Sequence, residues 1–221
     1  MNTSQSSEAD ARRVIRVVER LVADSDDIEA ICEKARRAAA SAPDELHRER
    51  RAVRYIIRHY SNLTALGGGA SGLPGLLPVV GSVFSVFGAG ALDAVLALKF
   101  ELEMALALSS LAGFDIEEPK ERKFAFLLAC ASLADAYAAD KEPTLAQVVD
   151  IAMGEFSTRE MSKSLIKMMA RVIVMMTAKR MTRFVPFVSL AVGASVNKVM
   201  SAHTGFECWM ALKRRRDAKK A

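Results

Sequence analysis

The sequence has few cysteines and few aromatic residues, and it lacks any strand pattern. Its 221 residues include three cysteines, Cys32, Cys130 and Cys208, which are far apart and odd in number. This argues against a disulfide framework and fits a reducing compartment. The three histidines are scattered and no Cys-x-x-Cys pair occurs, so no metal site is predicted. Alanine, leucine, methionine and arginine, which favour helices, dominate instead. The sequence therefore predicts an all-α fold.

The motifs of catalysis are also missing. Gly67–Gly75 lacks the lysine of a phosphate-binding loop, and no strand precedes it. His203 could be drawn into a triad with Ser201 and Glu207, but residues two apart on one helix diverge by about 200°. No catalytic residue and no cofactor are predicted.

The start of the sequence does not have the pattern of a signal peptide. Residues 1–10 are polar and slightly acidic, without the basic start and apolar stretch of a signal peptide. We expect a polar tail at 1–10, one helical domain of about nine helices at 11–212, and a basic tail at 213–221. A cytoplasmic protein is the corresponding expectation.

Charge is distributed unevenly along the chain. Residues 61–156 carry 5 basic and 12 acidic side chains, whereas residues 157–221 carry 14 basic and 3 acidic ones. An acidic middle and a basic last third predict either mutual docking or an anionic partner for the basic part.

A long segment contains no charged residue at all. From His59 to Leu92 there is no Asp, Glu, Lys or Arg, and eight of the twelve glycines fall there. Two prolines divide it into halves of 14 residues, each shorter than the roughly 20 that a spanning helix needs. The pattern predicts a helical hairpin that dips into one leaflet, or a buried hairpin in a soluble core. The hairpin residues are Gly67, Gly68, Gly72, Leu73, Pro74, Gly75, Leu76, Leu77, Pro78, Phe84 and Phe87.

Two basic clusters in the last third are candidates for binding an anionic surface. Arg159, Lys163, Lys167 and Arg171 recur every four residues, so they share one face of a helix. This pattern is typical of a basic amphipathic helix at a membrane and equally of a solvated bundle helix. The second cluster comprises Lys213, Arg214, Arg215 and Arg216. Phosphates of lipid or of nucleic acid suit it, and nucleic acid is the weaker candidate because few aromatics interleave.

A few polar groups interrupt otherwise apolar helices. Asp93, Lys99, Glu101 and Glu103 are the charges of one such stretch, and burial requires each to be paired. Lys99 and Glu103 are one turn apart, which predicts a direct ion pair. Asp93, Lys99, Glu103 and Asn197 are the predicted buried polar residues. A soluble hydrolase-like enzyme using Asp93 and Glu103 is the alternative function.

Two stretches of the sequence resemble the EcsC protein family. The first is TALGGGASGLPGLLPVVGSVFSV, followed by Asp93, Lys99 and the stretch LAGFD. The second is VPFVSLAVGASVNKV at 185–199, before a helix that ends in the basic run after Trp209. The resemblance implies a helical bacterial protein, often encoded near transport or secretion systems, and it carries no catalytic residue. Together with the hairpin, it predicts a membrane-associated accessory protein whose partners are anionic lipids and a membrane protein.

Overall fold

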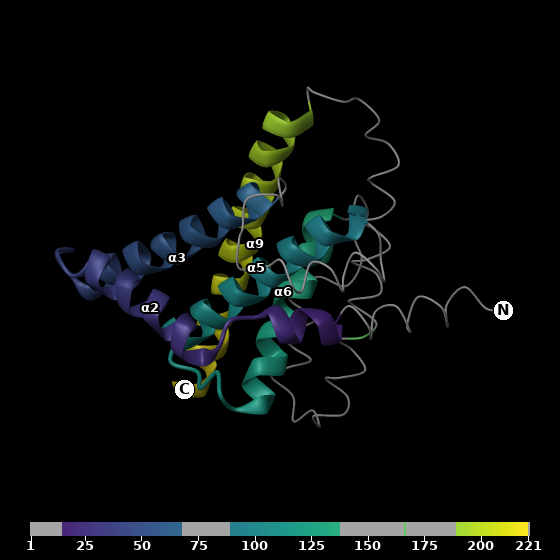
Figure 1. Cartoon of the computed structure of the whole chain (residues 1–221). Helices are drawn as coiled ribbons and strands as arrows, with labels where there is room; N and C mark the ends of the chain where they lie inside the picture. The colour runs from purple at the N-terminus through teal and green to yellow at the C-terminus, as the bar shows by residue number, and fades with distance from the viewer. Residues whose placement is uncertain (1–14, 68–88, 138–165, 167–188, 221) are drawn as a thin grey trace.

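The computed structural model describes residues 15–67, 89–137, 166 and 189–220. All regular secondary structure in these ranges is helical. A short helix over residues 15–21 comes first. The longer ones are α2 (Ser25–Ala39), α3 (Glu45–Gly67), α5 (Ala89–Leu111), α6 (Pro119–Tyr137) and α9 (Ser189–Lys220). The all-α fold is thus confirmed for these residues. Figure 1 shows α9 running the height of the molecule, with its first turns extending beyond the other helices.

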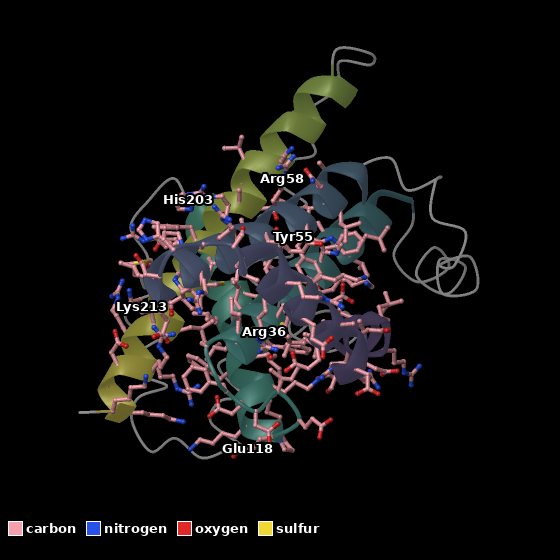
Figure 2. All side chains as sticks on the ribbon, turned by 90° about the vertical axis from the view of Figure 1, so that its left-hand side faces the viewer. Arg36, Tyr55, Arg58, Glu118, His203 and Lys213 are labelled. Carbon is pink, nitrogen blue, oxygen red and sulfur yellow. The ribbon has the colours of Figure 1, made fainter. Side chains whose placement is uncertain are left out.

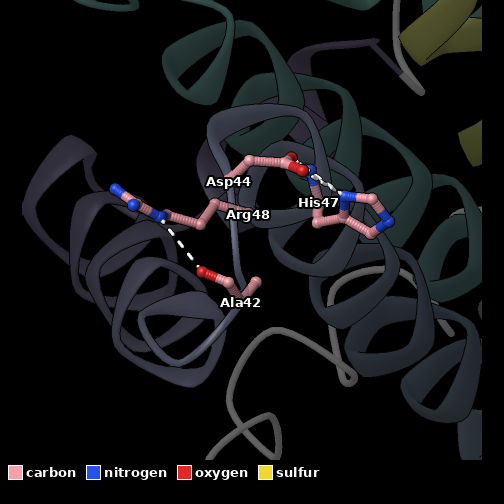
Figure 3. Close-up of polar contacts among 4 residues, drawn as sticks. All are labelled: Ala42, Asp44, His47 and Arg48. Carbon is pink, nitrogen blue, oxygen red and sulfur yellow. Dashed lines mark hydrogen bonds and ion pairs between the residues drawn. The ribbon is translucent and has the colours of Figure 1, made fainter.

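The connection between α2 and α3 is fixed by a capping aspartate (Figure 3). The Asp44 Oδ1 atom accepts the backbone N–H of His47 at 2.8 Å, and the His47 ring lies 2.9 Å from the same carboxylate. The hydrogen bond from the backbone of His47, followed by that from its side chain, lowers the pKa of Asp44. Pro43 therefore precedes the cap, and α3 begins at Glu45. Arg48 closes the loop by donating to the Ala42 carbonyl at 3.5 Å.

The reversal between α5 and α6 is made by Gly113. Its φ of 91° is the left-handed conformation that glycine adopts most easily. The N–H of Phe114 donates to Ser109 and that of Gly113 to Ser110, which is the paired bonding of a Schellman motif. Asp115 caps the following turn by accepting the N–H of Glu117, and α6 itself begins four residues after Asp115.

Helix α5 lies at the centre and contacts α2, α3, α6 and α9. Every residue from Glu101 to Ser110 is buried, so this helix has no solvent-facing stripe. Such a helix must be surrounded, which explains why most of its residues are apolar. α9 approaches it closely at Gly205, where an added Cβ would meet the Met104 sulfur at 2.7 Å and Ile57 at 2.9 Å.

The uncharged segment is partly accounted for by this packing. Tyr60, Ser61 and Thr64 are buried in α3, which ends at Gly67, and α5 begins again at Ala89. In the first part of the uncharged segment, α3 therefore continues to Gly67 and packs on α9. The other predicted hairpin residues, Gly68 to Phe87, lie outside the described residues. No helix in the described ranges is long and apolar enough to cross a membrane.

Candidate functional site

Four arginines share the outward side of α3. At about 100° per residue, Arg50, Arg51, Arg54 and Arg58 fall within an arc of about 100°. All four are exposed, and the apolar residues of the same turns face inward. We call this set the α3 arginine face. Figure 2 shows Arg58 toward the end of α3, with Arg36 of α2 lower in the same view.

The α3 arginine face makes few internal contacts. Arg51 donates to the Ser41 hydroxyl at 2.9 Å, which leaves most of its guanidinium in solvent. No ion pair joins Arg50, Arg54 or Arg58 to any residue within the described ranges. The guanidinium groups of Arg50, Arg54 and Arg58 therefore form no ion pair that would stabilise the described part of the fold.

The arginines at the end of α9 are arranged differently. Arg215 is 7% exposed and forms a two-point ion pair with Glu121, including an Nη2–Oε1 contact of 2.7 Å. Its guanidinium carbon lies 4.5 Å and 4.3 Å from the ring centres of Phe114 and Phe124. Burial alone would raise the pKa of Glu121, but Arg215 and Lys219 outweigh it and hold the pKa below its ordinary value. Arg215 thus fastens α9 to α6.

Arg216 is also engaged, whereas its neighbours are more open. It forms an ion pair with Glu49 of α3 and lies over the Trp209 ring at 5.5 Å. Arg214 is exposed, and Lys213 is half-buried. The predicted basic tail at 213–221 is helical as far as Lys220, and two of its four predicted surface-binding residues face inward.

The sequence-predicted pair Lys99 and Glu103 is present in α5, and Glu103 has a second role. The Lys99 ammonium lies 2.6 Å from Glu103 Oε1, and the backbone N–H of Ala23 donates to the same oxygen at 2.7 Å. Glu103 is 3% exposed. The carboxylate therefore ties the start of the chain to the central helix, which is a structural use of this group.

Glu101 is a second buried carboxyl group of α5, and it was not among the buried polar residues predicted from the sequence. Glu101 is 1% exposed, and its Oε2 atom has no hydrogen-bond partner among the described residues. It shares a hydrogen bond with Ser201 of α9, and burial raises its pKa to about 8 although that hydrogen bond acts in the opposite direction. The sequence does contain a hint of this difference. Glu101 and Glu103 are two residues apart and point in directions about 200° apart on the helix, so Lys99 cannot pair with both.

Several of the predicted site residues have side chains that lie outside the described part of the structure. Asp93 lies in α5 and Asn197 in α9, and their side chains are not among those that the structure describes. Arg159, Lys163, Lys167 and Arg171 also lie outside the described residues. Of the residues in the rejected triad, Ser201 is buried and His203 is exposed, so they diverge as their spacing predicts. No group of side chains in the described ranges could hold a metal ion.

Comparison with known proteins gives no relative. No protein-family model, no curated protein and no solved structure matches the chain. The resemblance to the EcsC family therefore stays a prediction, and the class that the structure defines is an all-α protein packed around one buried helix.

Proposed function

We propose that this protein is a helical accessory protein that docks on the cytoplasmic face of an anionic membrane, with a shallow insertion by its glycine-rich hairpin. The observation that carries the proposal is the α3 arginine face, with three guanidinium groups that have no described partner. Each cation close to an anionic bilayer contributes about 1 kcal/mol of attraction. Exposed arginines in this arrangement suit lipid phosphates.

The place of this face along the chain supports the same function. α3 ends at Gly67 and leads directly into residues 68–88, which contain ten apolar residues, six glycines, two prolines and no charge. Charge attraction alone gives weak, reversible membrane binding, and a neighbouring apolar element gives the second anchor. Arg159, Lys163, Lys167 and Arg171 would add to the attraction. The resemblance to EcsC proteins extends the proposal to a role beside a transport or secretion system.

Vesicle flotation tests the proposal on the whole protein. Vesicles of phosphatidylcholine with and without phosphatidylglycerol should separate the charge contribution, and binding should be confined to the anionic ones. Arg50→Glu with Arg54→Glu should weaken binding at least about 10-fold, because two favourable charges of about 1 kcal/mol each become repulsive. Raising the salt concentration should weaken the wild type as well.

A matched control distinguishes the face from net charge. Lys120→Glu with Lys220→Glu changes two exposed cations at the starts and ends of other helices and alters the net charge equally. This variant should retain most of its binding. Equal losses in the two variants, or binding of the wild type to neutral vesicles alone, would reject the α3 arginine face as the docking site. Release by salt would indicate surface docking, and resistance to carbonate would indicate insertion.

A further inference from the structure

Helix α9 turns two large apolar side chains to solvent, although it packs against α3, α5 and α6. Val199 is 69% exposed and Phe206 is 54% exposed. Because they are seven residues apart, they lie within about 20° of each other around the helix and about 10 Å apart along its axis. His203, which is also exposed, lies between them. We call these three residues the α9 exposed stripe.

Two contacts between α3 and α9 fix the relative direction of these helices. Glu49, in the first turns of α3, forms an ion pair with Arg216 near the end of α9. Thr64, near the end of α3, accepts a hydrogen bond at 3.4 Å from Ser201 in the first half of α9. Residue numbers therefore rise along one helix as they fall along the other, so the two helices are antiparallel.

This arrangement places the α9 exposed stripe and the α3 arginine face on the same side of the molecule. Ile57 of α3 and Gly205 of α9 mark the place where the helices approach most closely. Counted from these two positions at about 100° per residue, Arg58 and Phe206 are each turned by about 100°. In an antiparallel pair, equal rotations point to the same side. Figure 2 accordingly shows both Arg58 and His203 in the upper half of one view.

The combined surface is positively charged on α3 and apolar on α9. Axes of packed helices are about 8–10 Å apart, so the two parts are neighbours. Asp217 of α9 lies 3.6 Å from Arg216, and Glu207 is half-buried. These are the two acidic residues of α9, so its stripe offers no free carboxylate to the arginines of a second copy. The phosphates and acyl chains of an anionic bilayer match both parts of the surface.

We propose that the α3 arginine face and the α9 exposed stripe form one membrane-binding surface. Phe206 and Val199 insert between lipid headgroups, while the arginines contact lipid phosphates. This orientation rests on the proposed function, membrane docking through α3, and adds that α9 lies beside α3 on the bilayer. Apolar residues of interfacial helices reach about 5–10 Å into the boundary between headgroups and acyl chains. The surface also continues into the uncharged segment, because α3 ends at Gly67 directly before residues 68–88.

Fluorescence quenching by brominated lipid tests the contact at Phe206. Trp209 is the single tryptophan, so Phe206→Trp is combined with Trp209→Phe. With vesicles of phosphatidylglycerol and brominated phosphatidylcholine, the emission of this variant should fall by about half or more and shift to the blue. Glu118→Trp with Trp209→Phe is the control, because Glu118 is exposed and lies at the lower end of the view in Figure 2. Its emission should be nearly unchanged by the same vesicles.

Affinity measurements separate the α9 contact from docking through α3. Phe206→Ser should raise the Kd for phosphatidylglycerol-containing vesicles roughly 5-fold, and Phe206→Leu should keep most of the affinity, because apolar burial supplies it. The position is exposed, so thermal unfolding of both variants should match that of the wild type. An unquenched Phe206→Trp variant, or an unchanged Kd in Phe206→Ser, would overturn the α9 contact. Loss of binding in Arg50→Glu with Arg54→Glu would then leave the proposed function standing, whereas a wild type that binds no anionic vesicles would reject both.

A second copy of the chain is the competing occupant of the α9 exposed stripe. Sedimentation velocity without vesicles should show a monomer. A dimer that dissociates in Phe206→Ser would mean that the stripe is a contact between two copies, which overturns the proposal.

Discussion

Two sets of arginines differ more in their surroundings than in their sequence. The α3 arginine face is exposed and has almost no internal partners, whereas Arg215 and Arg216 at the end of α9 each hold a carboxylate of another helix. Both sets look like clusters of positive charge in the sequence. The structure assigns the α9 pair to the stability of the fold and leaves the α3 arginine face available for a partner.

The difference follows from what surrounds each guanidinium. Arg215 lies against Phe114 and Phe124 and is removed from water, so its charge is tolerable only while Glu121 remains opposite. Arg54 and Arg58 keep their hydration and need no partner. Substitutions should therefore separate the two sets by their effects on folding.

The largest effect is expected at Arg215. Arg215→Ala leaves the carboxylate of Glu121 buried without its main partner, which costs about 3–5 kcal/mol of the free energy of unfolding. Urea denaturation followed by circular dichroism measures it. The neighbouring exposed residue supplies the control, because Arg214→Ala should stay within about 0.5 kcal/mol of the wild type. Similar free energies of unfolding for Arg215→Ala and Arg214→Ala would contradict the distinction between buried and exposed arginines.

A smaller effect is expected for the partly exposed pair of Arg216 and Glu49. The side chains are 21% and 20% exposed, so solvent screens the interaction in part. A double-mutant cycle with Arg216→Ala and Glu49→Ala should give a coupling energy of about 1–2 kcal/mol. A coupling energy near zero would mean that the ion pair between Arg216 and Glu49 does not stabilise the fold, as for the exposed arginines of α3.

Acid should act on the α9 end through Glu121. The pKa of Glu121 is lowered in the folded state relative to its ordinary value of 4.5, so the stabilisation is present above pH 4.5 and is lost as the pH falls through the lower folded pKa. Glu121→Gln should be less stable than the wild type near neutral pH and should lose less stability on acidification below 4.5. Parallel acid profiles for the two proteins would contradict this account.

The smallest effect on folding is expected at the α3 arginine face. Arg54→Gln and Arg58→Gln remove charge from exposed positions without a described ion pair, so each should change the free energy of unfolding by less than about 0.5 kcal/mol. Thermal and urea unfolding provide the values. A loss above 1 kcal/mol would mean that these arginines support the fold.

The sequence predicted local features well because neighbouring residues determine them. The one-turn pair of Lys99 and Glu103 depends only on short-range geometry. The burial of Arg215 depends on Glu121, 94 residues earlier, and on which face α9 turns toward α6. Glu101 was equally hard to interpret, because its polar partner Ser201 lies on another helix, 100 residues later in the chain. Spacing along one helix carries no information on such contacts.

Membrane affinity of matched variants tests the central claim most directly. Arg50→Gln with Arg54→Gln and Lys213→Gln with Arg214→Gln each remove two positive charges and leave the fold intact on the present account. Titration with phosphatidylglycerol-containing vesicles should show at least about a 10-fold increase in Kd for the α3 pair, at about 1 kcal/mol per charge, and a smaller increase for the α9 pair. An unchanged Kd for the α3 pair would contradict docking through the α3 arginine face.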